Sequence, residues 1–409
     1  MARKPLSDLK AYVENKKVHL TFYKSTPFFL ESRERKSQSV VRIYRKPEPD
    51  FEFGRDYAEF FDGSDYRDAV KIFEGRLKEH NLRKFEFTDK NVSVCRTYSY
   101  WISLQHPCNP TGPVPVRVRD PEVWWTHEKI ERCMDALVRK HTGWVQKKKF
   151  GTTAGGKDIN GILAGNRKNM IAFTGTIHAG ESGPELLLPA LKKILQNDRS
   201  LLRKTGVAIL PSVNIDEREK LVHGCPWYLR CNSNGVDINR NFDAKWNSVE
   251  YGYGMVSSDP DSGTYRGSSP ESEPETKAVV NFVDETKPTV VFSFHALASI
   301  CSACFLFSKY AANNVSFRKK AAILVGAYTR GMYVGETKDV KLSPSSSAGS
   351  LSTWLYLKRG IQGFDLEHDG TKDAKPSLTD LTTRGLVRQY QKKHYEGIVC
   401  VMKSLIKGD

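Results

Sequence analysis

The stretch that most constrains the fold of this chain covers residues 170–181 and reads MIAFTGTIHAGE. Up to Ile177 its residues are apolar or small and favour extended structure, as expected for a buried strand of a sheet. The strand then enters a turn that carries His178 and Glu181. A strand that ends in His-x-x-Glu delivers two metal-compatible side chains to the rim of a sheet, where binding crevices form. The stretch therefore predicts half of an α/β unit with part of a metal site.

Strands and helices alternate after this stretch. Pro184 and the apolar run behind it predict a helix. Further buried strands are expected at 206–210, 289–294 and 361–366, and helices are expected to begin near 274 and to close the chain. This alternation argues for an α/β sheet with parallel pairs of strands at its centre.

The N-terminal part of the chain has a different character. Residues 1–118 carry no cluster of metal-binding side chains and contain short β-like runs between polar and Pro-containing segments. They predict a small, mainly β accessory domain, with one helix over 66–80. The breaker cluster at 109–113 predicts a linker, and an apolar helical stripe begins soon after it. We therefore expect an accessory domain over 1–118 and a second domain over 119–409.

The composition is that of a soluble globular protein, with 39% hydrophobic and 27% charged residues among 409. No run approaches the ~18 apolar residues of a membrane span, and the N-terminal segment lacks the apolar core of a signal peptide. We expect a cytoplasmic protein with no membrane partner. The net charge of +16 suits an acidic peptide tail or a nucleic acid, and equally a solvated basic surface.

A third metal-compatible side chain, His295, follows the apolar strand expected at 289–294. It therefore occupies the same kind of strand-end position as His178. Two imidazoles and the Glu181 carboxylate, with an open fourth position, form the coordination expected of a catalytic zinc ion. The sequence predicts one zinc bound by these three residues.

A site of this kind needs a base that takes a proton from the attacking water and passes it to the leaving amine. Glu367 follows the strand expected at 361–366, at the rim where the metal ligands lie. The period of two places Asp365 on the same face of the strand, but Glu367 is longer and lies closer to the rim. Glu367 is therefore the predicted base.

The motif NGVDINRNF at 234–242 is the most specific piece of sequence. Asn239 and Arg240 offer adjacent amide and guanidinium donors to a planar carboxylate, as in recognition of a free carboxy terminus or an acidic side chain. Arg230, a little earlier in the chain, is a candidate to stabilise the oxyanion that forms when water adds to the carbonyl.

Together these residues resemble the zinc carboxypeptidases of the carboxypeptidase A type, over roughly residues 122–406. In that family His-x-x-Glu and a later His hold one zinc ion, an Asn-Arg pair binds the substrate carboxylate, and a Glu before the last helix is the base. The resemblance implies a mixed, eight-stranded sheet flanked by helices, and it implies the same roles for His178, Glu181 and His295, for Asn239 and Arg240, and for Glu367.

The sequence at 228–231, Tyr-Leu-Arg-Cys, looks like a stretch of the cytosolic carboxypeptidase branch. Members of that branch carry a β-rich domain before the catalytic one and place this Arg at the oxyanion, which supports Arg230 in that role. The chain departs from the wider family because 342–348 contain no Tyr where the family has its active-site Tyr. The position that shapes side-chain specificity in the family is Leu351 or Ser352 here, and neither supplies a charge.

We therefore expect a zinc metallocarboxypeptidase that hydrolyses a peptide or amide bond near a free carboxylate, on peptide or protein C-terminal tails. The missing Tyr motivates an alternative, a zinc amidohydrolase that deacylates acylated amino acids, although the Asn-Arg-Asn-Phe motif tells against it. A further alternative is a basic binding protein with a vestigial site, whose N-terminal domain holds nucleic acid or another acidic polymer. The intact ligand set and base argue against that alternative.

Overall fold

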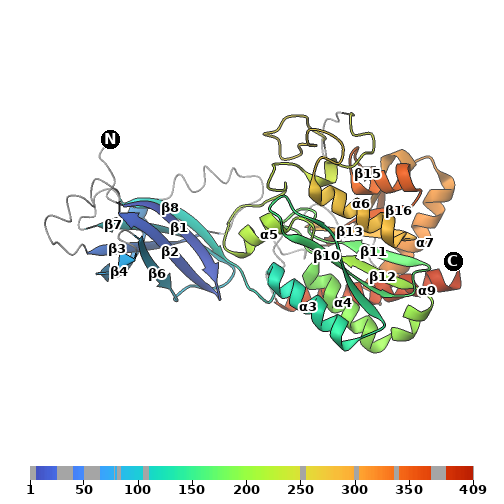
Figure 1. Cartoon of the computed structure of the whole chain (residues 1–409), viewed down its shortest axis with the longest axis horizontal. Helices are drawn as coiled ribbons and strands as arrows, with labels where there is room; N and C mark the ends of the chain where they lie inside the picture. Colours follow the sequence, from blue (N-terminus) through green and yellow to red (C-terminus); the bar gives the residue numbers. More distant parts are fainter. Residues whose placement is uncertain are drawn as a thin grey trace. The chain divides into compact units, whose positions relative to one another are not determined.

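The computed structural model describes residues 6–24, 40–49, 65–77, 79–80, 84–104, 110–248, 255–298, 304–335, 340–369 and 384–408. The chain forms two compact units, shown with their elements in Figure 1. One unit comprises 1–124 together with 220–227, and the other comprises 125–219 together with 228–409. The domain boundary at 118/119 stays a prediction.

The first unit is a sandwich of two antiparallel sheets, which confirms the small, mainly β region expected before the catalytic part. Their strand orders are β1-β2-β6-β5 and β4-β3-β7-β8. Apolar side chains from both sheets, such as Leu20 and Tyr100, form one buried cluster between them. The strands are β1 (Leu6–Glu14), β2 (Lys17–Lys24), β3 (Val41–Glu48), β4 (Val70–Gly75), β5 (Glu79–His80), β6 (Lys84–Asp89), β7 (Arg96–Leu104) and β8 (Thr111–Val118).

The prediction of a helix over 66–80 is wrong. Only a short 3-10 turn, η1 (Tyr66–Asp68), forms there, and the chain continues as β4 and β5. Strand β4 pairs antiparallel with β3, with Phe73 opposite Ile43 and Val70 opposite Arg45. Pairing with a strand far away in sequence, together with β-prone Val and Ile residues, outweighs the local helical periodicity.

The second unit is built on an eight-stranded mixed sheet with the order β15-β14-β16-β13-β11-β12-β10-β9. The four central strands, β16, β13, β11 and β12, run parallel to one another, as the alternation of strands and helices predicted. The strands are β9 (Val145–Thr152), β10 (Asp158–Gly165), β11 (Met170–Thr174), β12 (Gly206–Leu210), β13 (Val290–Ala298), β14 (Cys304–Ser308), β15 (Lys341–Ser346) and β16 (Gln362–Asp369).

Helices cover both faces of this sheet. Figure 1 shows α4 and α9 on one side of it and α6 on the other. The helices of this part of the chain are α3 (His127–Lys140), α4 (Pro184–Asn197), α5 (Ile215–Val222), α6 (Pro274–Thr286), α7 (Val315–Met332), α8 (Leu351–Trp354) and α9 (Arg384–Lys407). Among the described residues, none of the helices combines the length and apolar character needed to cross a bilayer.

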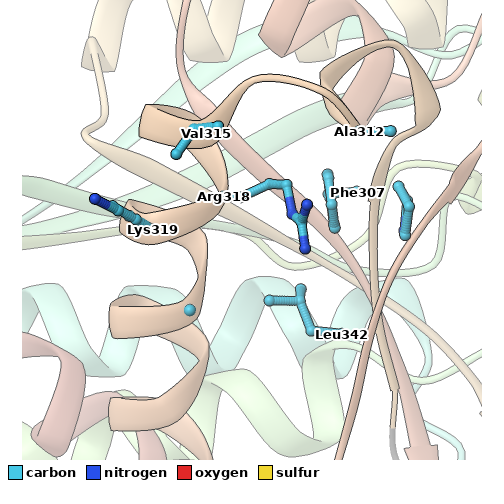
Figure 2. Close-up of a pocket in the computed structure, with 8 residues that line it drawn as sticks. Phe307, Ala312, Val315, Arg318, Lys319 and Leu342 are labelled. Carbon is cyan, nitrogen blue, oxygen red and sulfur yellow. The ribbon is translucent and has the colours of Figure 1, made fainter.

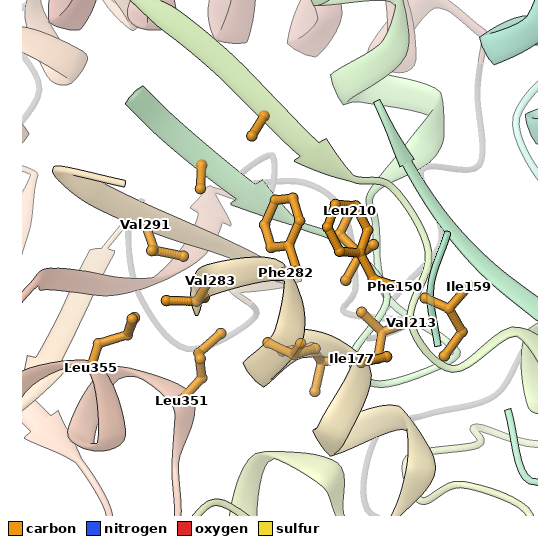
Figure 3. Packing of buried hydrophobic residues seen from close by; sticks show 14 of the residues in the cluster. Phe150, Ile159, Ile177, Leu210, Val213, Phe282, Val283, Val291, Leu351 and Leu355 are labelled. Carbon is orange, nitrogen blue, oxygen red and sulfur yellow. The ribbon is translucent and has the colours of Figure 1, made fainter. Parts of the chain in front are cut away.

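The core beneath the site lies between the sheet and α6 and α8. Figure 3 shows Phe282 of α6 beside Phe150 of β9, and their ring centroids are 5.1 Å apart in an edge-to-face arrangement. Val291 of β13 and Leu351 of α8 belong to the same buried cluster. Full burial of one such side chain contributes about 1.5–3 kcal/mol, so this packing fixes the strands whose ends carry the site.

Candidate metal and catalytic site

The strand order places the predicted ligands together. Strand β11 is followed in the chain by β12 on one side of it and later by β13 on the other, so the order of the sheet reverses between β11 and β13. Open α/β sheets bind ligands at such a reversal, outside the carboxyl ends of the strands. His178 follows β11, and His295 lies in β13 just after its regular pairing with β16 ends at Phe294.

The loop after β11 is held in an unusual backbone conformation. Gly175 and Gly183 lie against each other, because a Cβ added at Gly175 would be 2.6 Å from the Cα of Gly183. Between them Thr176 has a φ of 47°, a strained value for a β-branched residue. Its hydroxyl lies 2.8 Å from that of Ser212, which anchors the loop. The two glycines therefore close the loop that presents His178 and Glu181.

Three side chains converge as the sequence predicted. The Nδ1 atoms of His178 and His295 each lie 2.9 Å from Oε2 of Glu181. All three residues are buried, and their ligand atoms lie within 4.8 Å of one another. His178 Nδ1 makes no hydrogen bond within the described part of the chain despite its short distance to Glu181. A buried nitrogen in this state is what a metal ligand requires.

The outer nitrogens of both imidazoles face buried oxygens. His178 Nε2 lies 3.0 Å from Oδ1 of Asp237. His295 Nε2 lies 3.1 Å from the Ser293 hydroxyl and 3.5 Å from Oδ1 of Asp365. A carboxylate or hydroxyl on Nε2 fixes the tautomer that leaves the Nδ1 lone pair for a metal. Two imidazoles, one carboxylate and these outer partners fit a zinc ion.

The charges of the metal-free site are strongly coupled. Burial opposes ionisation of Glu181, but the two imidazoles outweigh it and hold the pKa of this carboxyl well below its usual range. Burial likewise opposes protonation of His295, but Glu181 and Asp365 raise its pKa well above the usual value. In the metal-free protein these carboxylates therefore favour the protonated form of His295, and a metal must compete with that proton.

This coupling predicts how zinc binding responds to pH. Below the raised pKa of His295, zinc competes with one proton. The apparent association constant should therefore increase by up to about tenfold per pH unit from the ordinary imidazole pKa, about 6.5, up to the raised value. Competition against a chromophoric chelator measures this slope, and metal analysis should give one zinc per chain. A pH-independent affinity over this range, or unchanged stoichiometry in His295→Ala, would contradict the assignment.

Asp237 links Arg230 to the metal ligand His178. Its Nε and Nη2 atoms donate to Oδ2 of Asp237 at 2.9 and 2.8 Å, while Oδ1 of the same carboxylate faces His178. Burial opposes ionisation of Asp237, yet Arg230 and His178 hold its pKa far below the usual range. Asp237 thus fixes the guanidinium next to the metal ligands. Asp237 lies within the motif at 234–242, but the motif alone assigns it no role.

Glu367 lies in β16, opposite Cys304 of the antiparallel strand β14. It is half-buried, and Phe364 packs on the other face of the strand against Phe292, as the period of two predicted. Burial raises the pKa of Glu367 to about 8; Glu181 and Asp365 also raise it, whereas His295 and Arg230 lower it. Carboxyl groups with pKa values perturbed in this way cluster at functional sites. The role of Glu367 as the base stays a prediction.

Asn239 and Arg240 form the short 3-10 turn η3 (Ile238–Arg240), and both are buried. Asn239 Oδ1 accepts a hydrogen bond from the backbone N–H of Leu351, which leaves its Nδ2 as the donor. Arg240 Nη1 donates to the Asn239 carbonyl. Gly349 has a φ of 66°, and a Cβ there would overlap the carbonyl oxygen of Arg240. The Gly-Ser turn before α8 therefore packs directly on the Asn-Arg pair.

The two predicted specificity residues are both buried in α8. Leu351 joins the hydrophobic cluster under the sheet. The Ser352 hydroxyl donates to Oδ2 of Asp365 at 3.0 Å, and the Ser346 hydroxyl donates to the same oxygen at 2.8 Å. Ser352 is thus linked to His295 through Asp365. A role of Leu351 or Ser352 in specificity stays a prediction.

A buried arginine that no local sequence pattern singles out supports the loop that carries His178 and Glu181. Arg218 of α5 donates through Nη1 to the carbonyl oxygens of Ala179 and Glu181, at 3.0 and 2.9 Å. Its Nη2 lies 3.4 Å from a carboxylate oxygen of Glu185 in α4. In the sequence, Arg218 stands among other charged residues, as on the exposed surface of a helix. Only the fold shows that it is buried against the loop.

A cavity of about 540 Å³ lies elsewhere in this unit, beside the start of α7 and the strands β14 and β15 (Figure 2). None of the predicted site residues lines it. The chemistry described above therefore belongs to the strand ends and not to this cavity, whose lining residues are Phe307, Ala312, Val315, Arg318, Lys319, Ala322, Leu342 and Pro344.

The chain is similar to known proteins. The sequence profile of a family described as zinc carboxypeptidase matches residues 130–387. Carboxypeptidase O of Bos taurus is 30% identical over 319 residues, which cover 70% of this chain and 76% of that protein. Murein peptide amidase A of Escherichia coli K12 is 33% identical over 135 residues, which cover 32% of this chain and 50% of that protein.

The fold has solved counterparts as well. The crystal structure of carboxypeptidase A from Helicoverpa armigera matches with a TM-score of 0.59 and 17% identity, over 71% of this chain and 75% of that one. This likeness confirms the predicted mixed sheet flanked by helices.

Proposed function

Because this chain belongs to the zinc carboxypeptidase family, we propose that it hydrolyses the peptide or amide bond next to a free carboxylate at the end of peptide or protein tails. The protein is a metallocarboxypeptidase that uses one zinc ion. The observation that best supports the proposal is the convergence of both His Nδ1 atoms on one oxygen of Glu181.

In this proposal each step of the reaction is assigned to a residue or to the metal. When bound, zinc supplies the Lewis-acid chemistry that activates water and polarises the carbonyl. Glu367 accepts a proton from the attacking water and delivers it to the leaving amine. Arg230, held by Asp237, keeps donor N–H groups near the developing oxyanion.

The substrate's free carboxylate is assigned to Asn239 and Arg240. A planar guanidinium beside an amide donor suits bidentate carboxylate recognition, and the backbone contacts of both residues hold them in place. The net charge of +16 favours acidic tails among the substrates. We also propose a cytoplasmic location and membership of the cytosolic carboxypeptidase branch.

A second candidate is hydrolysis of an amide bond in a smaller acylated amino acid or peptide. The similarity to a murein peptide amidase and the absence of Tyr from 342–348 favour it. The complete Asn-Arg-Asn-Phe motif at 239–242 favours terminal-carboxylate recognition instead. The two candidates differ in what they require of the substrate's carboxyl end.

Amidating the C-terminus of a peptide substrate should separate these candidates. Amidation removes a charge-assisted interaction with Asn239 and Arg240, worth ~1.5–3 kcal/mol, so kcat/KM should fall roughly 10- to 150-fold. The missing Tyr leads us to expect the lower end of this range. Matched free-acid and amidated peptides measure the ratio directly.

Arg240→Ala provides the control, because the pocket then lacks the charge that distinguishes the two peptides. The ratio of their kcat/KM values should approach one in this variant. Equal cleavage of both peptides by the wild-type protein would remove terminal-carboxylate recognition, even with zinc and Glu367 confirmed. The deacylase or an endopeptidase activity would then be the better account.

A further inference from the structure

The cavity of about 540 Å³ beside α7 combines apolar walls with a cation (Figure 2). Helix α7 contributes Val315, Arg318 and Ala322, which share one face of the helix because they are three and four residues apart. Strands β14 and β15 contribute Phe307 and Leu342. The volume lies within the range of about 300–1,000 Å³ that is usual for small-molecule sites.

Ring packing holds the apolar floor of this cavity in place. Phe307 is buried, and its ring centroid lies 5.9 Å from that of Phe317 on α7. Phe317 packs edge-to-face against Tyr356, with ring centroids 4.9 Å apart. The Tyr356 hydroxyl accepts a hydrogen bond from the side chain of Asn314, the N-cap residue of α7. Contacts behind the cavity therefore fix the position of its floor.

Arg318 is the cation that faces this floor. Figure 2 shows its side chain directed from α7 toward Phe307, whereas the side chain of Lys319 is directed away. Among the described residues, none that lines the cavity is acidic, and none forms an ion pair or hydrogen bond with the Arg318 guanidinium. By contrast, the exposed Arg359 donates to both carboxylate oxygens of Asp284, at 2.6 and 2.8 Å. The donors of Arg318 are therefore open to an anion from outside the chain.

We propose that this cavity binds a small apolar carboxylate, an aromatic or branched aliphatic acid without an ammonium group. A guanidinium suits a planar carboxylate because two parallel N–H donors match its two oxygens. The apolar floor suits a ring or a branched chain, whose transfer out of water is favourable. The site is separate from the proposed catalytic centre, because none of the predicted site residues lines the cavity.

The lining also disfavours two other occupants. The ammonium group of an amino acid, the product of the proposed reaction, would find no acidic partner among the described lining residues. An extended peptide would have to pair with β15, which is an edge strand of the sheet. Pro344 of β15 offers no backbone N–H for such pairing. A compact acid therefore fits the cavity better than either.

Isothermal titration of naphthoate into the zinc-loaded Arg240→Ala protein tests the proposal, because this variant lacks the guanidinium assigned to the substrate carboxylate. We expect one naphthoate to bind per chain. Adding Arg318→Gln should weaken binding about two- to tenfold, a modest loss because the guanidinium is exposed to solvent. Naphthalene carboxamide, the neutral analogue, should bind more weakly than the acid and should not respond to Arg318→Gln. Adding Ala322→Phe instead places a ring in the cavity and should prevent binding of both probes.

Lys320→Gln is the matched control, because it removes a positive charge from the same helix at a residue that does not line the cavity. It should leave the affinity for naphthoate unchanged. No binding of naphthoate to the Arg240→Ala protein would overturn the proposal, a result that needs no further variant to fold. Equal losses of affinity in Arg318→Gln and Lys320→Gln, or unchanged binding in Ala322→Phe, would overturn it as well.

Discussion

Glu367→Gln should lower kcat/KM by ~100- to 10,000-fold while the protein keeps its zinc, because general acid–base catalysis contributes about this much. Glutamine preserves the shape of the side chain but accepts no proton. Glu367 is not among the three converging ligand residues, so metal binding should persist. The measurement is steady-state kinetics on a free-acid peptide, with metal analysis of the same sample.

Glu128→Gln is the matched control for this substitution. Glu128 lies on α3 with its side chain 76% exposed, and its ion pair with Arg132 is a surface pair. Such a pair contributes little, so the variant should keep wild-type kinetics. Near-normal turnover in Glu367→Gln, with zinc present, would exclude Glu367 as the base.

Arg218→Ala should lower the free energy of unfolding by ~3–5 kcal/mol, because it leaves the Glu185 carboxylate buried without its partner. Both residues are only 2% exposed, so water cannot replace the guanidinium. The substitution also leaves the carbonyl oxygens of Ala179 and Glu181 without a donor. Chemical denaturation of the metal-free protein measures the loss, and zinc affinity should fall as the loop loosens.

Glu185→Gln separates the ion pair from the support of the loop. This variant also leaves a charge buried, but Arg218 can still donate to the two loop carbonyls. It should therefore be destabilised with zinc affinity close to wild type. An Arg218→Ala protein as stable as wild type, or equal losses of zinc affinity in both variants, would show that Arg218 does not support the ligand loop.

The ligands could be predicted because local sequence signals and sheet geometry agree. His178 and Glu181 share one loop after the buried strand β11. His295 lies near the end of β13, the parallel strand that pairs directly with β11. Parallel strands bring their carboxyl ends to one edge, so strand-end position alone predicts proximity. The strand bounds differed, because β13 and β16 continue past His295 and Glu367.

The groups that contact the Nε2 atoms of the two histidine ligands could be predicted only in part. Asp365 shares a strand face with Glu367, a relation that the period of two already shows. Its contact with His295 depends on the register of β13 against β16, which pairs Ser293 with Asp365. Register is set by packing across the sheet, so the sequence alone leaves such a contact unspecified.

Arg218 and the strand β4 illustrate what local pattern omits. Arg218 is buried because α5 packs its guanidinium against two loop carbonyls and Glu185, and no spacing along the chain encodes that contact. Strand β4 forms because β3 offers a pairing edge about 30 residues away in sequence. In both cases the decisive partner is distant along the chain, where periodicity carries no information.

Incubating the zinc-loaded protein with a mixed peptide library, and reading the products by mass spectrometry, shows whether it removes residues from the carboxyl end. We expect losses of single C-terminal residues from free-acid peptides, abolished by Glu367→Gln. Products of internal cleavage, or loss of an N-terminal acyl group with the carboxyl end intact, would contradict this expectation.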